Sequence, residues 1–211
     1  MAQRHRVILI GGASHAGKST FARELALRLG WDCVSTDSLA RHPGRPWRAP
    51  PDVVPDHVRA HYLDLSVDAL MASVLAHYRS MLPMITGLVQ SYVEDTAKRG
   101  LVLEGSALLP ESVLSLTTPQ VRAVWLIADE ALLRTRIHVG SGFAEANPEG
   151  QAMIDNFLAR ALAFNRRMIE DVGRLGLPSL AVDGTTPPEQ LSQAYLAKPG
   201  PRALSPIYRS P

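Results

Sequence analysis

Residues 7–30 contain three patterns in sequence, and their order constrains the fold more than any other feature of the chain. Val7–Ile10 is a short apolar run that predicts a fully buried strand, and a glycine-rich segment comes directly after it. From Gly17 the apolar residues recur with the period of a helix, which we expect to end at Gly30. The apolar face of this helix contains Phe21, Leu25 and Leu29. A buried strand, a glycine-rich loop and an amphipathic helix are therefore expected in direct succession.

The glycine-rich loop matches the phosphate-binding pattern GxxxxGK[ST] at every defined position. It consists of Gly12, Ala13, Ser14, His15, Ala16, Gly17, Lys18 and Ser19, with Thr20 next in the chain. Such a loop turns its backbone N–H groups toward a polyphosphate, and the N-terminus of the next helix points to the same place. We expect Lys18 to reach the β- and γ-phosphates of ATP and the Ser19 hydroxyl to help hold Mg²⁺. The alternative is an ordinary strand-to-helix turn, although the flanking strand and helix provide the context that a phosphate loop requires.

The rest of the chain alternates between strand and helix patterns. Further strands are predicted at 32–36, 101–103, 121–128 and 180–182, and helices at 66–99, 129–139, 151–172 and 188–197. Pro83 should break or bend the helix over 66–99. This alternation predicts an α/β fold with a parallel sheet covered on both faces, in which ligands bind beyond the carboxyl ends of the strands.

Composition favours one globular domain over residues 1–197, with a proline-rich tail at 198–211. Of 211 residues, 46% are apolar and 20% are charged, which is enough to bury a core. The net charge of +2, without a long basic run, argues against nucleic acid as the main partner, and the apolar stretches are too short for a membrane span of ~20 residues. The N-terminus is interpreted as a strand entering a loop, not as a signal peptide.

The use of cysteine and lysine adds two constraints. The single cysteine, Cys33, excludes an internal disulfide, fits a reducing cytoplasm and is expected to be buried in the second strand. The chain has 19 arginines and three lysines, and Lys18 is the only lysine among the first 97 residues. A compact ammonium suits a point contact between two phosphates better than a planar guanidinium, so this placement supports the phosphate-loop interpretation.

Two classes of phosphate-loop protein can be set aside on motifs. The three asparagines are followed by Pro, Phe and Arg, so an Asn-Lys-x-Asp guanine motif is absent from the sequence, as is an LSGGQ-like transporter signature. The segments VILIGGASHAGKST and STDSL resemble small P-loop kinases that phosphorylate hydroxyl groups, especially chloramphenicol phosphotransferase-like and 2-phosphoglycerate kinase-like proteins. Shikimate and gluconate kinases are more distant. The resemblance is sharp over residues 7–39 and implies a three-layer α/β/α P-loop fold with a five-stranded parallel sheet in the order 2-3-1-4-5.

Two carboxylates lie at the ends of predicted strands. The resemblance implies an aspartate just beyond strand 2, near the hydroxyl to be phosphorylated, and Asp37 matches that position. Asp37 could orient the acceptor hydroxyl and accept its proton, or it could instead cap a helical turn. Glu104 ends the apolar run of strand 3, where P-loop proteins hold Mg²⁺, although aspartate is commoner there. Glu104 could alternatively be the base, bind substrate or cap a nearby helix.

Several arginines are candidates for phosphate contact. In the resembling kinases the region after strand 4 forms a lid whose arginines neutralise the migrating phosphoryl group, which here implies Arg134 and Arg136, together with a lid-like loop at 140–150. Arg134 is the first choice. Arg160 and Arg167 share a side of the next helix and are weaker candidates, because most helical arginines are solvated or paired with acids. By position, residues 182–185 are expected to wrap the adenine.

A proline- and arginine-rich segment at 40–55 is the most unusual stretch outside the phosphate loop. Its members Arg41, His42, Arg45, Trp47 and Arg48 could clamp an anionic or aromatic acceptor, or form a plain surface loop. His57, His61 and His77 have no spacing that compels a metal site, so they are expected to be ordinary polar or core residues.

These features predict an ATP- and Mg²⁺-dependent phosphotransferase that acts on a hydroxyl of a small molecule. One alternative is a nucleoside or nucleoside-monophosphate kinase with the same architecture. Another is a nucleotide-binding regulatory ATPase that signals through a partner protein. The apolar stretch 66–99 could supply the surface of a homodimer.

Overall fold

The computed structural model describes residues 5–40, 42–48 and 53–197 and contains one five-stranded sheet. The strands are β1 (Val7–Gly12), β2 (Asp32–Ser35), β3 (Leu101–Glu104), β4 (Val121–Ala128) and β5 (Ser179–Val182). All neighbouring strands are parallel, and their order is β2-β3-β1-β4-β5. The predicted sheet and strand order are confirmed. Because the sheet is parallel, the loops after β1, β2 and β3 leave it at the same edge.

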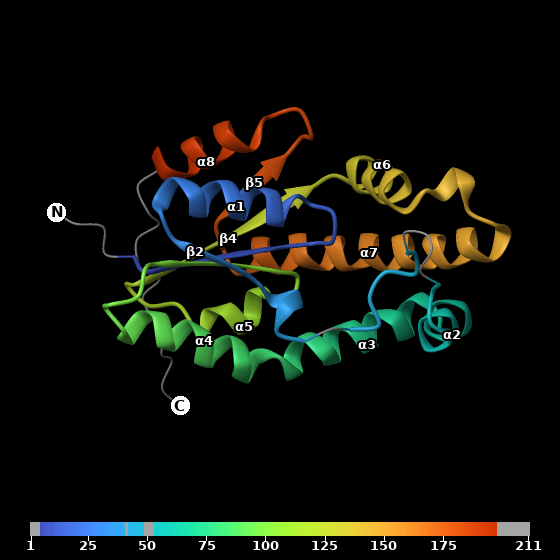
Figure 1. Ribbon diagram of the computed structural model, residues 1–211, viewed down its shortest axis with the longest axis horizontal. Coiled ribbons are helices and arrows are strands. Elements are labelled where there is room, and N and C mark those ends of the chain that lie inside the picture. Colours follow the sequence, from blue (N-terminus) through green and yellow to red (C-terminus); the bar gives the residue numbers. More distant parts are fainter. Residues whose placement is uncertain (1–4, 41, 49–52, 198–211) are drawn as a thin grey trace.

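Helices cover both faces of this sheet and form the predicted three layers (Figure 1). On one face α1 (Lys18–Leu29) packs against α8 (Pro188–Ala197) and against the central strands. On the other face α4 (Leu82–Glu94) contacts β1, and α7 (Pro148–Arg174) contacts β4. Strands β1 and β3 lie between the two layers and are buried at every position, which explains why their sequences are continuous apolar runs.

The helical boundaries agree with local signals that the sequence carries. Pro83 occupies the first turn of α4, so the predicted break separates α3 (Val67–Ser80) from α4 at Met81. Asp129 caps α6 (Glu130–Ser141) by accepting a hydrogen bond from the Leu132 backbone N–H at 2.7 Å. Helix α7 is the longest element, at 27 residues, and it packs against α2, α3, α5 and α6.

Four short elements and one boundary differ from the sequence-based expectation. The structure adds α2 (Asp56–Asp64), α5 (Pro110–Leu114), and the 3-10 turns η1 (Thr36–Ser38) and η2 (Phe143–Glu145). The loop expected at 140–150 is shorter, because α6 continues to Ser141 and α7 begins at Pro148. The side chain of Asn147 caps α7 by accepting from the Gly150 N–H at 2.8 Å. Whether this segment closes as a lid stays a prediction.

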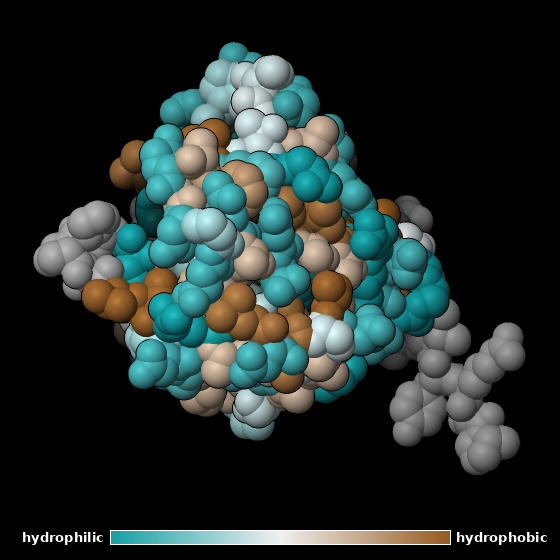
Figure 2. All heavy atoms as spheres, turned by 90° about the vertical axis from the view of Figure 1, so that its right-hand side faces the viewer, coloured by the Kyte–Doolittle hydropathy of each residue, from teal (hydrophilic) through white to brown (hydrophobic). Residues whose placement is uncertain are grey.

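The expectation for Cys33 is wrong. Its side chain is exposed because β2 is an edge strand of the sheet and is only partly covered. The proline-rich tail at 198–211 and Arg41 lie outside the described residues. Within the described part of the chain, none of the helices has the length and apolar character that crossing a membrane requires. Figure 2 shows one end of the molecule, where hydrophobic residues are interspersed with hydrophilic ones. Formation of a homodimer through residues 66–99 stays a prediction.

Candidate active site

The phosphate loop joins β1 to α1 and has the backbone conformation of an anion cradle. Gly12 and Gly17 have positive φ angles of 141° and 97°, and a Cβ at Gly12 would come within 2.7 Å of the Leu126 carbonyl oxygen. His15 also has a positive φ, 63°, which is uncommon for a residue other than glycine. Its carbonyl oxygen accepts a hydrogen bond from Arg136 at 3.0 Å, and this contact holds the strained turn in place.

Lys18 begins α1 and folds back over the loop. Its Nζ donates to the Ala13 carbonyl oxygen at 2.8 Å, and the side chain is buried, with 7% exposed. Burial lowers the pKa of Lys18, whereas the nearby Glu104 and Asp37 carboxylates act in the opposite direction. A buried ammonium held among backbone dipoles and two acids is a ready binding group for phosphate oxygens.

Ser19 and Glu104 form an oxygen pair beside this lysine. The Ser19 hydroxyl donates to Glu104 Oε1 at 2.9 Å, and Glu104 is buried at the end of β3, where it lies in register with Ile10 of β1 and Ser35 of β2. Two adjacent hard oxygen donors at the end of a phosphate loop fit Mg²⁺, which keeps most of its remaining ligands as water and substrate phosphate. In the ranges 5–40, 42–48 and 53–197, no larger cluster of His, Cys, Asp or Glu side chains is arranged to hold a metal.

Asp37 lies in η1, directly beyond β2, and its carboxylate is exposed to the same cavity as Lys18. The turn is capped by Ser35, whose hydroxyl oxygen accepts from the Asp37 backbone N–H at 3.3 Å, so Asp37 is not the cap of this turn. Thr36, just before it, is fully buried against Gly105, where an added Cβ would lie 1.7 Å from Thr36 Oγ1. This close approach ties the position of Asp37 to the end of β3 that carries Glu104.

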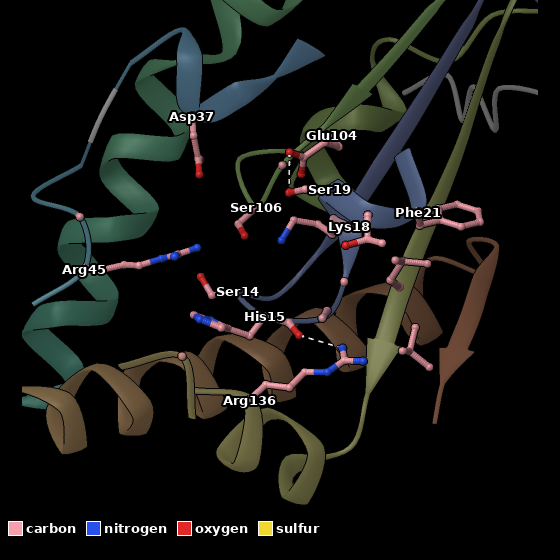
Figure 3. A pocket seen from close by; sticks show the side chains of 18 of the residues that line it. Ser14, His15, Lys18, Ser19, Phe21, Asp37, Arg45, Glu104, Ser106 and Arg136 are labelled. Carbon is pink, nitrogen blue, oxygen red and sulfur yellow. Dashed lines mark hydrogen bonds between the residues drawn. The ribbon is translucent and has the colours of Figure 1, made fainter. Parts of the chain in front are cut away.

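These groups share a cavity of about 1540 Å³ that opens beyond the carboxyl ends of the strands (Figure 3). Single-ligand sites occupy about 300–1,000 Å³, so this cavity has room for a nucleotide and a second small molecule together. Figure 3 shows Asp37 and Arg45 extending into the cavity from the side opposite the phosphate loop. Of the residues predicted from the phosphate-loop motif, Ser14 to Thr20 line it.

The arginine of α6 that reaches the site is Arg136, not Arg134. Arg136 lines the cavity and donates to the phosphate loop, whereas Arg134 is exposed and outside the residues that line it. The two positions are two residues apart, so their side chains leave the helix in nearly opposite directions. The choice of Arg134 from the sequence is therefore corrected to Arg136.

The proline- and arginine-rich segment faces the cavity. His42, Arg45, Trp47 and Arg48 all line it. Arg48 donates to the carbonyl oxygens of Arg45 and Trp47 at 2.6 and 2.8 Å and so stabilises its own loop. The Trp47 ring lies 4.9 Å from that of Phe157 and 6.0 Å from that of His15, centroid to centroid. The segment is thereby packed between the phosphate loop and α7.

Helix α2, which the sequence patterns did not reveal, holds this segment from behind. The Tyr62 hydroxyl donates to the Gly44 carbonyl oxygen at 2.6 Å, and the Asn156 side chain on α7 donates to the Tyr62 carbonyl oxygen at 2.7 Å. The buried residues of α2 are Val58 and Tyr62. The loop is therefore fixed to two helices rather than being a free surface loop.

Arg160 and Arg167, both on α7, have different surroundings. Arg160 is buried and lines the cavity, whereas Arg167 pairs with Asp171 at 3.5 Å and is outside the cavity lining. The two residues are seven positions apart, or about 10 Å along the helix axis, and this distance places Arg167 beyond the site.

Three histidines lie together beside the cavity, and two of them, His42 and His61, are close to Arg160. The His42 ring lies 5.0 Å from that of His61 and 5.4 Å from that of His77, and His42 Nε2 is 3.1 Å from the Ser73 hydroxyl. Burial, and after it the charge of Arg160, lowers the pKa of His42 to about 3, so this side chain is neutral at pH 7. His57 lies outside the lining of the main cavity.

Residues after β5 form the remaining wall. Val182, Gly184 and Thr185 line the cavity, as do Pro187 and Leu191 beyond them. The Asp183 carboxylate accepts from the backbone N–H groups of Thr185 and Thr186 at 2.9 and 2.8 Å, and these bonds lower its pKa. The loop is thus held in a compact turn that lines the same cavity as the phosphate loop; its assignment to the adenine stays a prediction.

Comparison with solved structures places this arrangement among known folds. The chain resembles a gluconokinase from Sinorhizobium meliloti 1021 with a TM-score of 0.52 and 18% identity, over 93% of this chain and 92% of the other. The two chains share a fold, and the sheet order β2-β3-β1-β4-β5 is the one expected for a P-loop fold. At this level of identity the likeness shows the fold alone.

Other matches are weaker. Shikimate kinase from Acinetobacter baumannii has a TM-score of 0.46 and 14% identity, covering 91% of each chain. Deoxyadenosine kinase from M. mycoides has a TM-score of 0.45 and 13% identity, covering 92% of this chain and all of the other, 100%. No protein-family model and no curated protein matches the sequence. The resemblance to chloramphenicol phosphotransferase-like and 2-phosphoglycerate kinase-like proteins stays a prediction.

Proposed function

We propose that the protein is a kinase that transfers the γ-phosphoryl group of ATP to a hydroxyl of a small molecule, with Mg²⁺. The observation that carries the proposal is that Lys18, the Ser19–Glu104 pair and Asp37 face one cavity with room for two ligands. A phosphate loop alone would suit any nucleotide-binding protein. A free carboxylate across the cavity from it supplies the group that a phosphotransferase needs for its second substrate.

The chain's own residues divide the chemistry between them. Lys18 and the loop N–H groups bind the β- and γ-phosphates, and Arg136 lies close enough to the loop to compensate charge on the transferring group. Ser19 and Glu104 hold Mg²⁺, which neutralises phosphate charge when bound. The turn of residues 182–185 lines the same cavity and is assigned to the adenine.

Asp37 is assigned to the acceptor hydroxyl. Its carboxylate orients the hydroxyl and accepts its proton while the hydroxyl oxygen forms a bond to the γ-phosphorus. The bond between that phosphorus and the bridging oxygen breaks at the same time, and the electron pair leaves with ADP. Glu104 is the weaker choice for this base, because its Oε1 already accepts the Ser19 hydroxyl beside the phosphate loop.

Substitution of Asp37 tests this assignment. Asp37→Asn should lower kcat about 10²–10⁴-fold and leave the ATP dissociation constant within about twofold, since the phosphate loop is untouched. Asp68→Asn, an exposed aspartate in the first turn of α3, is the matched control and should retain full activity. Undiminished kcat in Asp37→Asn would remove Asp37 from the mechanism.

An acceptor screen tests the reaction class. ADP formation is measured with hydroxy acids, sugars, aminoglycoside- and phenicol-type antibiotics, nucleosides and nucleoside monophosphates. Turnover restricted to the nucleosides and nucleotides would replace the proposal with a nucleoside-type kinase. ATP hydrolysis that no acceptor stimulates, together with nucleotide-dependent binding to a protein, would instead indicate a regulatory ATPase.

A further inference from the structure

Arg160 is a buried cation that the phosphoryl-transfer chemistry above does not use. It lies in the middle of α7, is 6% exposed and lines the cavity. Among the residues that the structure describes, no acid forms an ion pair with it and no acceptor takes a hydrogen bond from it, whereas Arg59, Arg166 and Arg174 are all paired with carboxylates. Burying a guanidinium without a counter-charge is costly, and such groups normally have an anionic partner.

The surroundings of Arg160 hold it in place without neutralising it. Its guanidinium lies 4.6 Å from the centre of the Phe157 ring and 5.8 Å from that of Tyr62, as in cation–π contacts. His42 and His61 are close by, and burial and the charge of Arg160 lower the pKa of both. Neutral imidazoles and aromatic faces can position the guanidinium, but they leave its full positive charge directed at the cavity.

A second arginine, from another segment of the chain, lines the same cavity. Arg45 extends from the 42–48 loop into the cavity (Figure 3), and its guanidinium lies 5.9 Å from the Trp47 ring. The charged lining is unequal in sign. Among the described residues that line the cavity, five side chains are cationic, Lys18, Arg45, Arg48, Arg136 and Arg160, and two are carboxylates, Asp37 and Glu104. Lys18 and Arg136 are committed to the nucleotide, and Arg48 to its own loop, which leaves Arg45 and Arg160 for the acceptor.

We propose that the acceptor is an anion as well as an alcohol: a small hydroxy compound whose carboxylate or phosphate group binds between Arg160 and Arg45. The inference rests on the proposed kinase function and specifies its substrate class. Arg160 supplies a rigid, desolvated fork for two anion oxygens, and Arg45 closes on the anion from the loop. The hydroxyl at the other end of the molecule then faces Asp37.

Matched ligand pairs separate charge from shape. Glycerate, gluconate and quinate are each compared with their primary amide, which keeps the hydroxyl groups and removes the charge, and glycerol 3-phosphate is compared with glycerol. Binding is measured by calorimetry in the presence of Mg²⁺ and a non-hydrolysable ATP analogue, and ADP formation is measured separately with ATP. We expect the best-binding acid to bind about 10- to 100-fold more tightly than its neutral counterpart. The carboxylate and phosphate pairs show which anion is preferred.

Variants then locate the charge that is responsible. Arg160→Met, which keeps an unbranched apolar side chain, should reduce the ratio of acid to amide affinity at least tenfold, and Arg160→Lys should restore part of it. Arg45→Met, in an exposed loop position, should reduce the ratio about 3- to 10-fold without affecting folding. Arg167→Met, on the same helix but outside the cavity, is the control and should leave the ratio unchanged. Thermal melting checks that each variant folds.

Two results would overturn the inference. One is that no acid binds more tightly than its neutral counterpart; the other is that the preference persists undiminished in folded Arg160→Met and Arg45→Met. Failure of the kinase proposal has a different signature, because it would show as absence of acceptor-dependent ADP formation whichever ligands bind. Tight binding and turnover of uncharged nucleosides alone would support the kinase and refute the anionic acceptor.

Discussion

The contact between Gly105 and Thr36 gives a sharp test of how the two carboxylates are positioned. A Cβ built at Gly105 lies 1.7 Å from Thr36 Oγ1 and 2.7 Å from Thr36 Cβ, both shorter than the 3.0 Å that real Cβ contacts respect. Thr36 is fully buried, so its side chain has no open space into which to move. Gly105→Ala must therefore shift the end of β3, the η1 turn or both.

Overpacking of this kind costs about 1–3 kcal/mol, and here the neighbour must move by more than about 1 Å, so the upper half of that range applies. For a chain of this size, about 2–3 kcal/mol corresponds to a fall in Tm of roughly 4–12 °C. Because Asp37 is the next residue after Thr36, kcat should fall more than the affinity for ATP, which depends on the separate phosphate loop.

Gly87→Ala in α4 is the matched control. A Cβ at Gly87 meets no atom within 4 Å, so this substitution should be neutral or raise the free energy of unfolding by about 0.5–1 kcal/mol. The double variant Gly105→Ala/Thr36→Gly removes the obstructing side chain and should regain part of the lost kcat. The reasoning is refuted if Gly105→Ala melts within about 1 °C of the wild type with kcat unchanged.

Three further predictions concern the cavity. The pKa of His42 is about 3 in the folded chain and 6.5 ordinarily, so between these values the unfolded chain binds the extra proton and stability falls as the pH falls. The free energy of unfolding, measured in urea at pH 7 and pH 5, should change less with pH in His42→Gln than in the wild type. The expected difference is about 0.5–1 kcal/mol per pH unit, after allowance for partial exposure, and an equal change in the two proteins would contradict this. Arg136→Met should lower kcat about 10- to 1,000-fold while Arg134→Met stays near wild type, and steady-state assays that rank them in reverse would reject the assignment of Arg136. Glu104→Gln should raise the Mg²⁺ concentration required for half-maximal rate about 10-fold or more, which a magnesium titration measures; an unchanged requirement would exclude Glu104 as a metal ligand.

The sheet and its order were predictable because β1, β3 and the phosphate loop leave little freedom. A continuous apolar run bounded by glycines can be buried on both faces, and the GxxxxGK[ST] pattern requires a strand before it and a helix after it. The bounds of β4 and α8 agree with those predicted from the sequence. The prediction that Cys33 is buried was wrong because an apolar pattern does not show whether a strand is central or at an edge.

Helix α2 was missed for a related reason. Its N-cap is Pro55 with no side-chain bond, and it buries only Val58 and Tyr62, so neither a capping signal nor an apolar stripe is present. The choice between Arg134 and Arg136 depends on the rotation of α6 about its axis, which tertiary packing sets. The same holds for Arg160, whose burial results from the contacts of α7 with α2 and α3 rather than from its local sequence.

The two halves of the cavity are built from different parts of the chain, and this division bears on how the protein can change. In the proposed assignment, the nucleotide half lies at the ends of β1, β3 and β5, whereas the acceptor half is made by residues 42–48 and the helices α3 and α7. Selection or engineering could therefore alter acceptor choice by exchanging the second group while the first stays intact. The contact of the His15 ring with Trp47 and Phe157 crosses this boundary, so it is the position at which a new acceptor loop would require a compensating change in the phosphate loop.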